Sequence, residues 1–349
     1  MKCSLYAKIM TSTCIIGISG YSGVGKTTLI RRILPELKKQ GFAVGVLKHI
    51  HHKLNIDIRG KDTDHFFRAG ADCVFAHDLQ QGFVRYRNND KSFPDLIKRF
   101  PVGLDLILVE GYKDAGIPGI RLETGAVGEK THAGHRNKKA IYRDDPQYHR
   151  KALAYIREEL EKVHSTRPLM AGLMINDKSA RIGVTETLLS LKWKTSAEMS
   201  FNTLSAVFGK IVLLGTGPLL RRLNAVDRLP GVCGLKSPVS FMLSAFRWSP
   251  GSAWIISSVD MIHMHKEAYA WLLGQRKPGI WGVLPKIKGS KEIEITGAVY
   301  EPMIFEHIES LAGQEAPTLQ EISRHPKVII PVIPESLTSA WRKEKALGE

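Results

Sequence analysis

The chain has 349 residues, of which 43% are hydrophobic and 24% are charged, and this composition excludes a disordered chain. The length predicts two globular domains, each large enough to bury its own core. No stretch approaches the roughly 18 consecutive apolar residues that a membrane helix needs, and the first residues lack the apolar segment of a signal peptide. We therefore expect a cytoplasmic protein that does not enter a membrane.

The chain carries 50 Lys+Arg against 34 Asp+Glu, a net charge of +16 that favours anionic partners such as nucleotides and phosphorylated cofactors. The excess is spread along the chain without a basic tail, which weakens the case for a nucleic-acid partner. The cysteines lie far apart in the sequence, at Cys3, Cys14, Cys73 and Cys233. This spacing suggests neither a disulfide framework nor a thiolate zinc site, and it fits a reducing compartment.

Strand-like and helix-like segments alternate through the first half of the chain, which is typical of a parallel sheet covered by helices. Apolar runs predict strands at 14–19, 42–47 and 104–109, and we expect helices at 27–40, 62–70 and 151–163. The segment 111–145 is rich in glycine, histidine and charge, and we interpret it as loops and short elements around a site. The polar segment 164–168 predicts a linker, so the first domain is expected to span 1–165.

The same alternation starts again in the second half, which we expect to form a domain spanning 166–349. The pattern predicts strands at 169–175, 210–214 and 254–259, helices at 185–191, 238–246 and 302–311, and further strands around 283–300 and 328–332. The predicted fold class is therefore α/β: a mostly parallel sheet with a phosphate-binding loop, followed by a second α/β domain.

The residues GYSGVGKT at 20–27 match the phosphate-binding pattern G-x-x-x-x-G-K-[ST], between a predicted strand and a predicted helix. Glycine allows positive φ angles and leaves room for backbone amides to converge on phosphate oxygens at the helix N-terminus. Lys26 is expected to contact the β and γ phosphates, and the Thr27 hydroxyl to ligate Mg²⁺. The alternative is a turn that merely connects strand to helix. The residues expected to cradle phosphate are Gly20, Ser22, Gly23, Val24, Gly25, Lys26 and Thr27.

Glu110 directly follows the apolar run 104–109, at the end of a strand where side chains reach a ligand crevice. We expect Glu110 to hold a magnesium-bound water or to orient an attacking one. The alternative is an acid that simply terminates the strand. Asp105 lies at the opposite end of the same strand, away from the predicted site.

Lys48 and His49 follow the second predicted strand, so they are also expected at the ligand edge, where they can contact phosphate or a carboxylated ligand. Zinc is disfavoured, although histidines stand at 49, 51 and 52, because no cysteine or close carboxylate completes a tetrahedral set. Solvated surface histidines are the alternative. Asp62 precedes a predicted helix, where an N-cap and a ligand contact are equally compatible with the sequence.

Taken together, these residues resemble a known family. The segment 20–28, KHIHH at 48–52, DIRGKDT at 57–63, AGA at 69–71 and LILVEGYK at 106–113 resemble MobB, the molybdopterin-guanine dinucleotide biosynthesis adapter protein, over about residues 14–163. The resemblance implies a GTP-binding protein of molybdenum-cofactor biosynthesis, with slow GTP hydrolysis and a dimeric form. It also implies that Gly25, Lys26, Thr27 and Thr28 bind phosphates, and that Glu110 is the acidic residue near Mg²⁺.

The ligands implied by this resemblance are GTP, Mg²⁺ and molybdopterin or its guanine dinucleotide. The implied partners are molybdenum-cofactor biosynthesis and insertion proteins, including a separate guanylyltransferase. Guanine itself is not read from the residues, because the string NKKA at 137–140 lacks the Asp of the Asn/Thr-Lys-x-Asp motif. Two other functions stay open: a P-loop kinase in which Glu110 positions an acceptor hydroxyl, and a non-catalytic module whose bound nucleotide sets its affinity for a partner.

The second half resembles, more weakly, MobA, the molybdenum cofactor guanylyltransferase, which has a nucleotide-binding α/β fold. In MINDKSARIGVTE at 174–186, Ser179 and Arg181 fit the family's opening L-A-G-G-x-S-x-R-M-G-x-D-K, so both are implied to bind nucleotide. Asn176 and Asp177 replace its paired glycines, and Glu186 replaces its lysine. The two Cβ atoms and the added negative charge are unfavourable in a loop that approaches a triphosphate. We therefore expect a fold without guanylyl transfer.

The segment SVDM at 258–261 resembles a C-D-M-P segment of the same family, whose Asp binds Mg²⁺. The resemblance implies that Asp260 is a metal ligand. Asp260 also follows a predicted strand, a placement that suits a carboxylate ligand.

Overall fold

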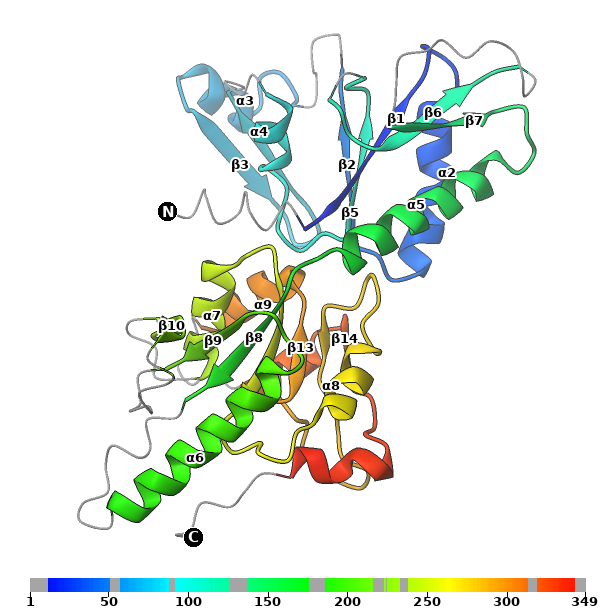
Figure 1. The fold of residues 1–349 in the computed structure, drawn as a ribbon. Coiled ribbons are helices and arrows are strands. Elements are labelled where there is room, and N and C mark those ends of the chain that lie inside the picture. The colour runs from blue at the N-terminus through cyan, green and yellow to red at the C-terminus, as the bar shows by residue number, and fades with distance from the viewer. Residues whose placement is uncertain are drawn as a thin grey trace.

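The computed structural model describes residues 12–50, 57–87, 92–113, 115–125, 137–175, 186–215, 223, 225–232, 238–312 and 319–342. Two large sheets follow each other along the chain, and helices cover both (Figure 1). The predicted α/β class is confirmed. Within the described ranges, we find no helix that has both the length and the apolar character to cross a membrane.

The first sheet consists of five parallel strands in the order β2-β5-β1-β6-β7. Its strands are β1 (Cys14–Ser19), β2 (Val44–Lys48), β5 (Leu106–Glu110), β6 (Gly119–Glu123) and β7 (Lys138–Tyr142). The helices α2 (Lys26–Lys39) and α5 (Tyr148–Ser165) pack together on one face (Figure 1). The short helix α4 (Phe93–Ile97) packs on the other face. Successive residues of β5 point to opposite, buried faces, which explains its continuous apolar run.

Most of the predicted elements of this half exist, with ends shifted by a few residues, but the interpretation of 111–145 as loops and short elements around a site did not identify two strands of the sheet. This segment contributes β6 and β7 to the sheet. The charged and glycine-rich sequence has no continuous apolar run that would indicate a strand. Strand β7 lies at the sheet edge, where Lys139 is exposed. At Gly119, a Cβ atom would lie 2.2 Å from the Gly17 carbonyl oxygen, so this glycine is needed for the close approach of two strands.

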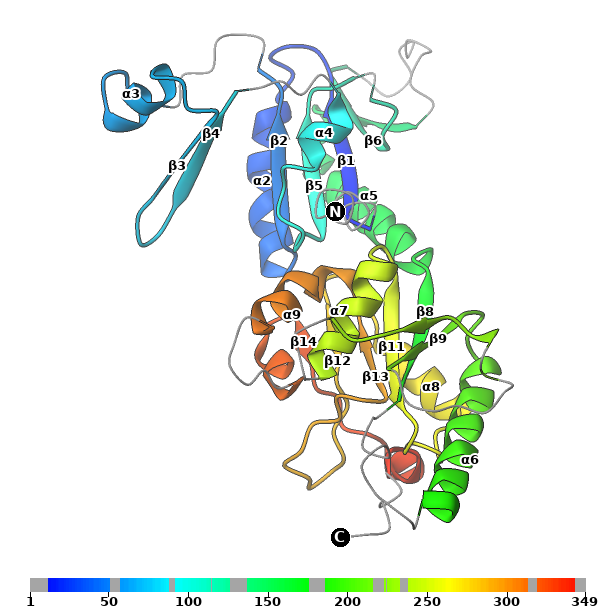
Figure 2. The same ribbon diagram turned by 90° about the vertical axis from the view of Figure 1, so that its left-hand side faces the viewer.

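A small arm lies beside the first sheet (Figure 2). It consists of α3 (Asp62–Arg68) and an antiparallel hairpin of β3 (Cys73–His77) and β4 (Gly82–Tyr86). Arg85 on β4 binds Asp57 at 2.7 Å and Asp64 at 3.1 Å, which ties the helix to the hairpin. Several large apolar side chains of the arm are exposed to solvent: Ile58, Phe66, Phe75, Leu79 and Val84.

The second sheet has seven strands in the order β10-β9-β8-β11-β13-β12-β14. They are β8 (Leu169–Met174), β9 (Ile211–Leu214), β10 (Arg228–Leu229), β11 (Ala253–Ser258), β12 (Gly282–Val283), β13 (Ala298–Tyr300) and β14 (Val328–Ile329). Strand β13 runs antiparallel to both of its neighbours, whereas the β10-β9-β8-β11 part is parallel. A mixed sheet of this kind confirms the second α/β unit.

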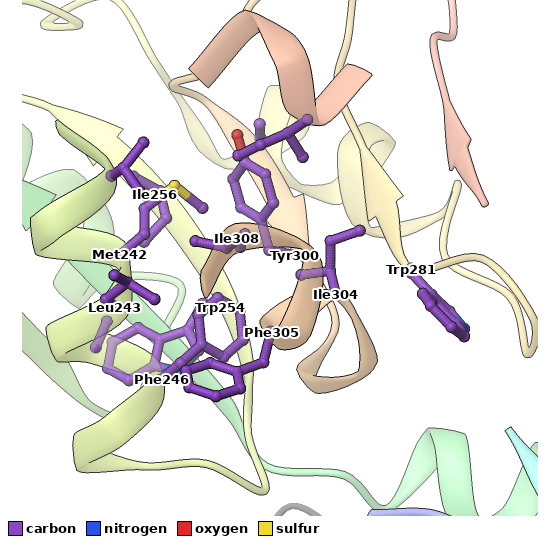
Figure 3. Close-up of a cluster of buried hydrophobic side chains, with 14 of the residues drawn as sticks. Met242, Leu243, Phe246, Trp254, Ile256, Trp281, Tyr300, Ile304, Phe305 and Ile308 are labelled. Atoms are coloured by element: carbon purple, nitrogen blue, oxygen red, sulfur yellow. The ribbon is translucent and has the colours of Figure 1, made fainter. Parts of the chain in front are cut away.

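Helices cover the two faces of the second sheet. They are α6 (Glu186–Ser205), α7 (Pro238–Trp248), α8 (Lys266–Leu273) and α9 (Phe305–Leu311), with 3-10 helices at Pro302–Ile304, Leu319–Arg324 and Glu335–Trp341. Figure 3 shows the core between α7, α9 and the sheet, where Phe246, Trp254 and Phe305 meet. The same core includes Val102, which precedes β5 of the first half, so the two halves share buried apolar surface.

The two halves are also joined by a buried ionic cluster around Glu301, the residue after β13. Its carboxylate accepts hydrogen bonds from Arg167 at 2.5 Å and Arg276 at 2.7 Å, and His164 Nε2 lies 3.4 Å away. Arg167 also donates to the carbonyl of Ser12 at 2.8 Å. The segment 164–168 is only partly exposed, because α5 continues to Ser165 and both His164 and Arg167 are buried at the junction.

A second contact between the halves involves Asp105, just before β5. Its carboxylate accepts hydrogen bonds from the Ala43 amide at 2.7 Å, the Trp281 indole at 2.7 Å and the Lys327 ammonium at 2.5 Å. Trp281 and Lys327 belong to the second half. Asp105 therefore fixes the amino end of β5 to the second half, opposite the end that carries Glu110.

Candidate phosphate-binding site

The residues predicted to bind phosphate meet at one edge of the first sheet. Because the five strands are parallel, their carboxyl ends share this edge. Strand pairing places Glu110 of β5 next to Lys48 of β2 on one side and Ile18 of β1 on the other. The turn 20–25 leads from β1 into α2 at the same edge, so the turn, Lys48 and Glu110 are neighbours.

The turn has the backbone conformation that its glycines permit. Gly20, Gly23 and Gly25 have φ angles of 145°, 78° and 101°, a region that favours glycine. A Cβ atom at Gly20 would lie 2.5 Å from the Leu122 carbonyl oxygen and 2.9 Å from the Val24 side chain, so no larger residue fits there.

Helix α2 directs its first amides toward this edge. The first helical bond joins the Leu29 amide to the Gly25 carbonyl at 2.8 Å. The amides of Lys26, Thr27 and Thr28 come before this bond and therefore lie at the helix N-terminus, where the helix dipole attracts anions. Ser22 is exposed on the turn, whereas Val24 is buried and anchors the turn to the core.

The polar side chains at the edge form one connected group. Thr27 Oγ1 donates to the Glu110 carboxylate, with 3.0 Å to each oxygen. Lys48 Nζ lies 3.3 Å from Thr27 Oγ1 and 3.5 Å from Glu110 Oε2. Lys26 Nζ donates to the carbonyls of Gly20 at 3.1 Å and Tyr21 at 2.7 Å. Two ammonium groups and one carboxylate thus leave a net positive charge beside the helix N-terminus.

This donor set fits a magnesium ion better than zinc. A hydroxyl and a carboxylate supply hard oxygen ligands, and Mg²⁺ commonly takes one or two of these together with phosphate oxygens and waters. Among the residues that the structure describes, no group of three or more His, Cys, Asp and Glu side chains is arranged to hold a metal ion. Lys48 contacts the same oxygens, so a bound divalent ion would have to displace its ammonium group.

His49 lies next to this group, but its ring contacts Tyr112 and not Thr27 or Glu110. Its amide donates to the Glu110 carbonyl at 3.0 Å, and its ring packs against Tyr112 with 4.9 Å between ring centres. A Cβ atom at Gly111, where φ is 105°, would lie 2.9 Å from His49 Cβ, so the glycine allows this packing. Burial raises the pKa of Tyr112, and the nearby Tyr86 adds to the increase.

Asp62 lies elsewhere, and the structure does not show the N-cap that was one of the two alternatives for this residue. It is the first residue of α3, whose N-cap is Lys61, and the side chain of Lys61 makes no capping hydrogen bond. The adjacent Thr63 instead donates to Asp57 at 2.8 Å. Asp62 is exposed on α3, which lies in the arm and apart from α2 in Figure 2.

Of the site residues expected in the second half, Ser179 and Arg181 lie outside the described residues. Asp260 lies just after β11, as expected from the sequence. Its Oδ1 atom is buried and has no hydrogen-bond partner among the residues that the structure describes. A buried carboxylate oxygen without a donor suits a cation ligand, because such an atom is otherwise costly to bury.

The sequence did not indicate that Arg143 lies at the carboxyl edge of the first sheet, near the turn 20–25. Arg143 directly follows β7, and its Cδ and Nε atoms lie 3.5 Å from the position that a Cβ atom would occupy at Gly25. The signal was lost because β7 itself was not predicted as a strand.

The N-terminal half matches known proteins. The family profile of molybdopterin guanine dinucleotide synthesis protein B matches residues 15–142. The molybdopterin-guanine dinucleotide biosynthesis adapter protein of Haemophilus influenzae is 39% identical over 110 residues, which are 31% of this chain and 62% of that protein. The adapter protein of Escherichia coli is 33% identical over 120 residues, which are 33% of this chain and 69% of that protein. The matched part is therefore less than two thirds of the Haemophilus protein.

Two solved structures cover different shares of the chain. Bacillus subtilis MobB has 24% identity over 40% of this chain and 96% of its own, with a TM-score of 0.33. The molybdopterin-guanine dinucleotide biosynthesis protein A of Archaeoglobus fulgidus has 12% identity over 50% of this chain and 91% of its own, with a TM-score of 0.38.

Proposed function

Because the chain belongs to the MobB family of molybdopterin guanine dinucleotide synthesis proteins, we propose that it is a GTP-binding adapter of molybdenum-cofactor biosynthesis. The observation that supports this proposal most is the contact of Thr27 with Glu110 beside the glycine turn 20–25. It joins the expected phosphate cradle to an acidic group suited to a divalent ion. Molybdopterin, or its guanine dinucleotide, is the proposed second ligand.

In the proposed complex, the amides at the start of α2 and the ammonium group of Lys26 bind the phosphate chain of GTP. Thr27 and Glu110 hold Mg²⁺, which when bound neutralises charge on the β and γ phosphates. Lys48 then pairs with the phosphates instead of with Glu110. Because Glu110 would hold Mg²⁺ together with Thr27, whose hydroxyl lies 3.0 Å from both carboxylate oxygens, it is better placed to hold a metal ion than to deprotonate water. We therefore propose that GTP hydrolysis is slow.

Replacing Glu110 with glutamine tests the proposed metal site. The variant removes the negative charge and keeps the shape, so we expect GTP affinity measured with Mg²⁺ to fall about tenfold, the size of a typical charge-assisted contact. Affinity measured in excess chelator should not fall. Glu36→Gln on the exposed side of α2 is the matched control. Equal losses with and without Mg²⁺ would show that Glu110 serves another purpose.

For the second half, we propose a divergent guanylyltransferase-like domain that spans 166–349 and follows a MobB-like domain at 1–165. The residues that replace the family's glycines, Asn176 and Asp177, lie outside the described residues. The unpaired oxygen of Asp260 supports a cation site in this half. In this proposal the domain binds or docks a ligand without transferring GMP.

The second half is expected to lack guanylyl transfer, because Asp177 and Glu186 bring negative charge to the proposed triphosphate loop. The full chain is incubated with GTP, Mg²⁺ and molybdopterin, and the mixture is analysed for dinucleotide and pyrophosphate. We expect neither product above background. Formation of dinucleotide by the full chain would refute the proposal. Loss of this product in an Asp260→Asn variant would show that the second half makes it.

The proposed partners are cofactor biosynthesis and insertion proteins in the cytoplasm, including a separate guanylyltransferase. We also propose a homodimer. The exposed apolar side chains of the arm, among them Phe66, Phe75 and Leu79, are the described surface that best supports an association of this kind.

A further inference from the structure

Arg143 stands on the opposite side of the phosphate turn from Lys48. In the sheet order, β2 with Lys48 and β7 with Arg143 are the two outer strands, and β1 with the turn lies between them. The Arg143 amide donates to the Glu123 carbonyl at 2.7 Å, which fixes its backbone to β6. Its Cδ and Nε atoms lie 3.5 Å, and its Cζ atom 3.8 Å, from the position of a Cβ atom on Gly25. The guanidinium therefore lies beside the N-terminus of α2.

This placement is electrostatically unfavourable unless an anion binds there. A cation beside a helix N-terminus faces the positive end of the helix dipole. Lys26 and Lys48 add two further positive charges at the same edge, and Glu110 supplies one negative charge. The structure shows no acidic partner for Arg143 among the described residues, and its side chain is exposed. The guanidinium is therefore available to a ligand.

The position of the metal group indicates which phosphate Arg143 can reach. Thr27, Glu110 and Lys48 lie on the β5–β2 side of the turn, so the β and γ phosphates that share the metal ion belong on that side. The rest of the nucleotide then extends toward β6 and β7. Arg143 lies on this second side of the turn, where the phosphate attached to the nucleoside would then be placed. A guanidinium can bind two oxygens of one phosphate at once.

We propose that Arg143 binds the α-phosphate of the nucleotide held by the turn 20–27. The inference rests on the proposed function, since it takes a bound nucleotide as its starting point. The two sides of the turn then bind different parts of the nucleotide. Lys48, Thr27 and Glu110 serve the β and γ phosphates and the metal ion, whereas Arg143 holds the α-phosphate, which GDP and GTP both carry.

The test is an equilibrium titration of the full chain with GDP and with GTP, in the presence of Mg²⁺, for the unchanged protein and for Arg143→Ala. We expect the variant to bind both nucleotides about tenfold more weakly and by the same factor, because the contact with the α-phosphate is common to them. Arg143→Lys should recover part of the loss, since it keeps the charge but not the paired donors. Arg150→Ala removes another exposed arginine, from the first turn of α5. Its affinity for both nucleotides should stay within twofold of that of the unchanged protein.

The inference is overturned if Arg143→Ala binds GDP as the unchanged protein does, or if the variant loses affinity for GTP alone. An equal loss in Arg150→Ala would also overturn it, because the effect would then be one of general charge. These results differ from a failure of the proposed function, in which the unchanged protein itself binds neither nucleotide. Since Arg143 is exposed, the variants are expected to fold normally, and an unchanged thermal unfolding midpoint checks this.

Discussion

Replacing Lys26 with alanine is expected to lower the affinity of the full chain for GTP by about a hundredfold or more. The ammonium group lies within the turn, 2.7 Å from the Tyr21 carbonyl, where it can transfer to phosphate oxygens without moving the backbone. Charged hydrogen bonds contribute about 1.5 to 3 kcal/mol each, and about 3 kcal/mol corresponds to roughly a hundredfold change in affinity. Isothermal titration or a fluorescent nucleotide measures the effect.

Lys39→Ala is the matched control for this variant. Lys39 lies at the other end of α2, is exposed, and pairs with Glu36 at 3.1 Å. The Lys39→Ala substitution changes the net charge by the same amount as Lys26→Ala, but far from the turn. GTP affinity should therefore stay nearly unchanged. If the two lysine variants bound GTP equally well, Lys26 would not be a phosphate ligand.

Replacing Glu301 with alanine is expected to lower the free energy of unfolding by about 3 to 5 kcal/mol. Glu301 is 2% exposed, and its removal leaves the buried Arg167 and the partly buried Arg276 without their acidic partner. Urea denaturation followed by circular dichroism measures the loss. Glu335→Ala removes an exposed carboxylate that binds Lys288, and it should cost little. Similar losses in both variants would show that the junction between the halves does not depend on Glu301.

Acid should weaken the same junction. Burial raises the pKa of Glu301, but the contacts with His164, Arg167 and Arg276 outweigh it and lower the pKa to about 2. Because the folded pKa lies below the ordinary value of 4.5, the stabilisation is fully present above pH 4.5 and is lost as the pH falls toward 2. We expect the stability of Glu301→Gln to change less over this range than that of the unchanged protein. Parallel pH profiles would contradict this expectation.

The arrangement of the strands at this edge of the first sheet was predictable from the sequence, because the elements there have strong local signals. The glycine spacing identified the turn, and the apolar run before Glu110 identified β5. Parallel pairing then brings Glu110 beside Lys48, as predicted from the ends of the two strands. Arg143 was missed because β7 has a polar sequence that resembles a loop, and its strand character comes from pairing with β6.

The junction between the halves was not predictable from local patterns. Glu301 joins His164, Arg167 and Arg276, which lie 25 to 137 positions away along the chain, so no sequence window contains them. Asp105 was interpreted as the end of a strand distant from the site. This is correct, but its contacts with Trp281 and Lys327 depend on how the second half packs. Similarly, the polar segment 164–168 resembles a linker until its partners are known.

A crystal structure of the full chain grown with GDP and Mg²⁺ tests the central proposal most directly. We expect electron density for the phosphates against the amides of residues 23–28, with Lys26 on the phosphate chain and a metal ion bound to Thr27. Nucleotide bound elsewhere on the molecule, with the turn 20–27 empty, would contradict the proposal that this edge of the sheet is a nucleotide site.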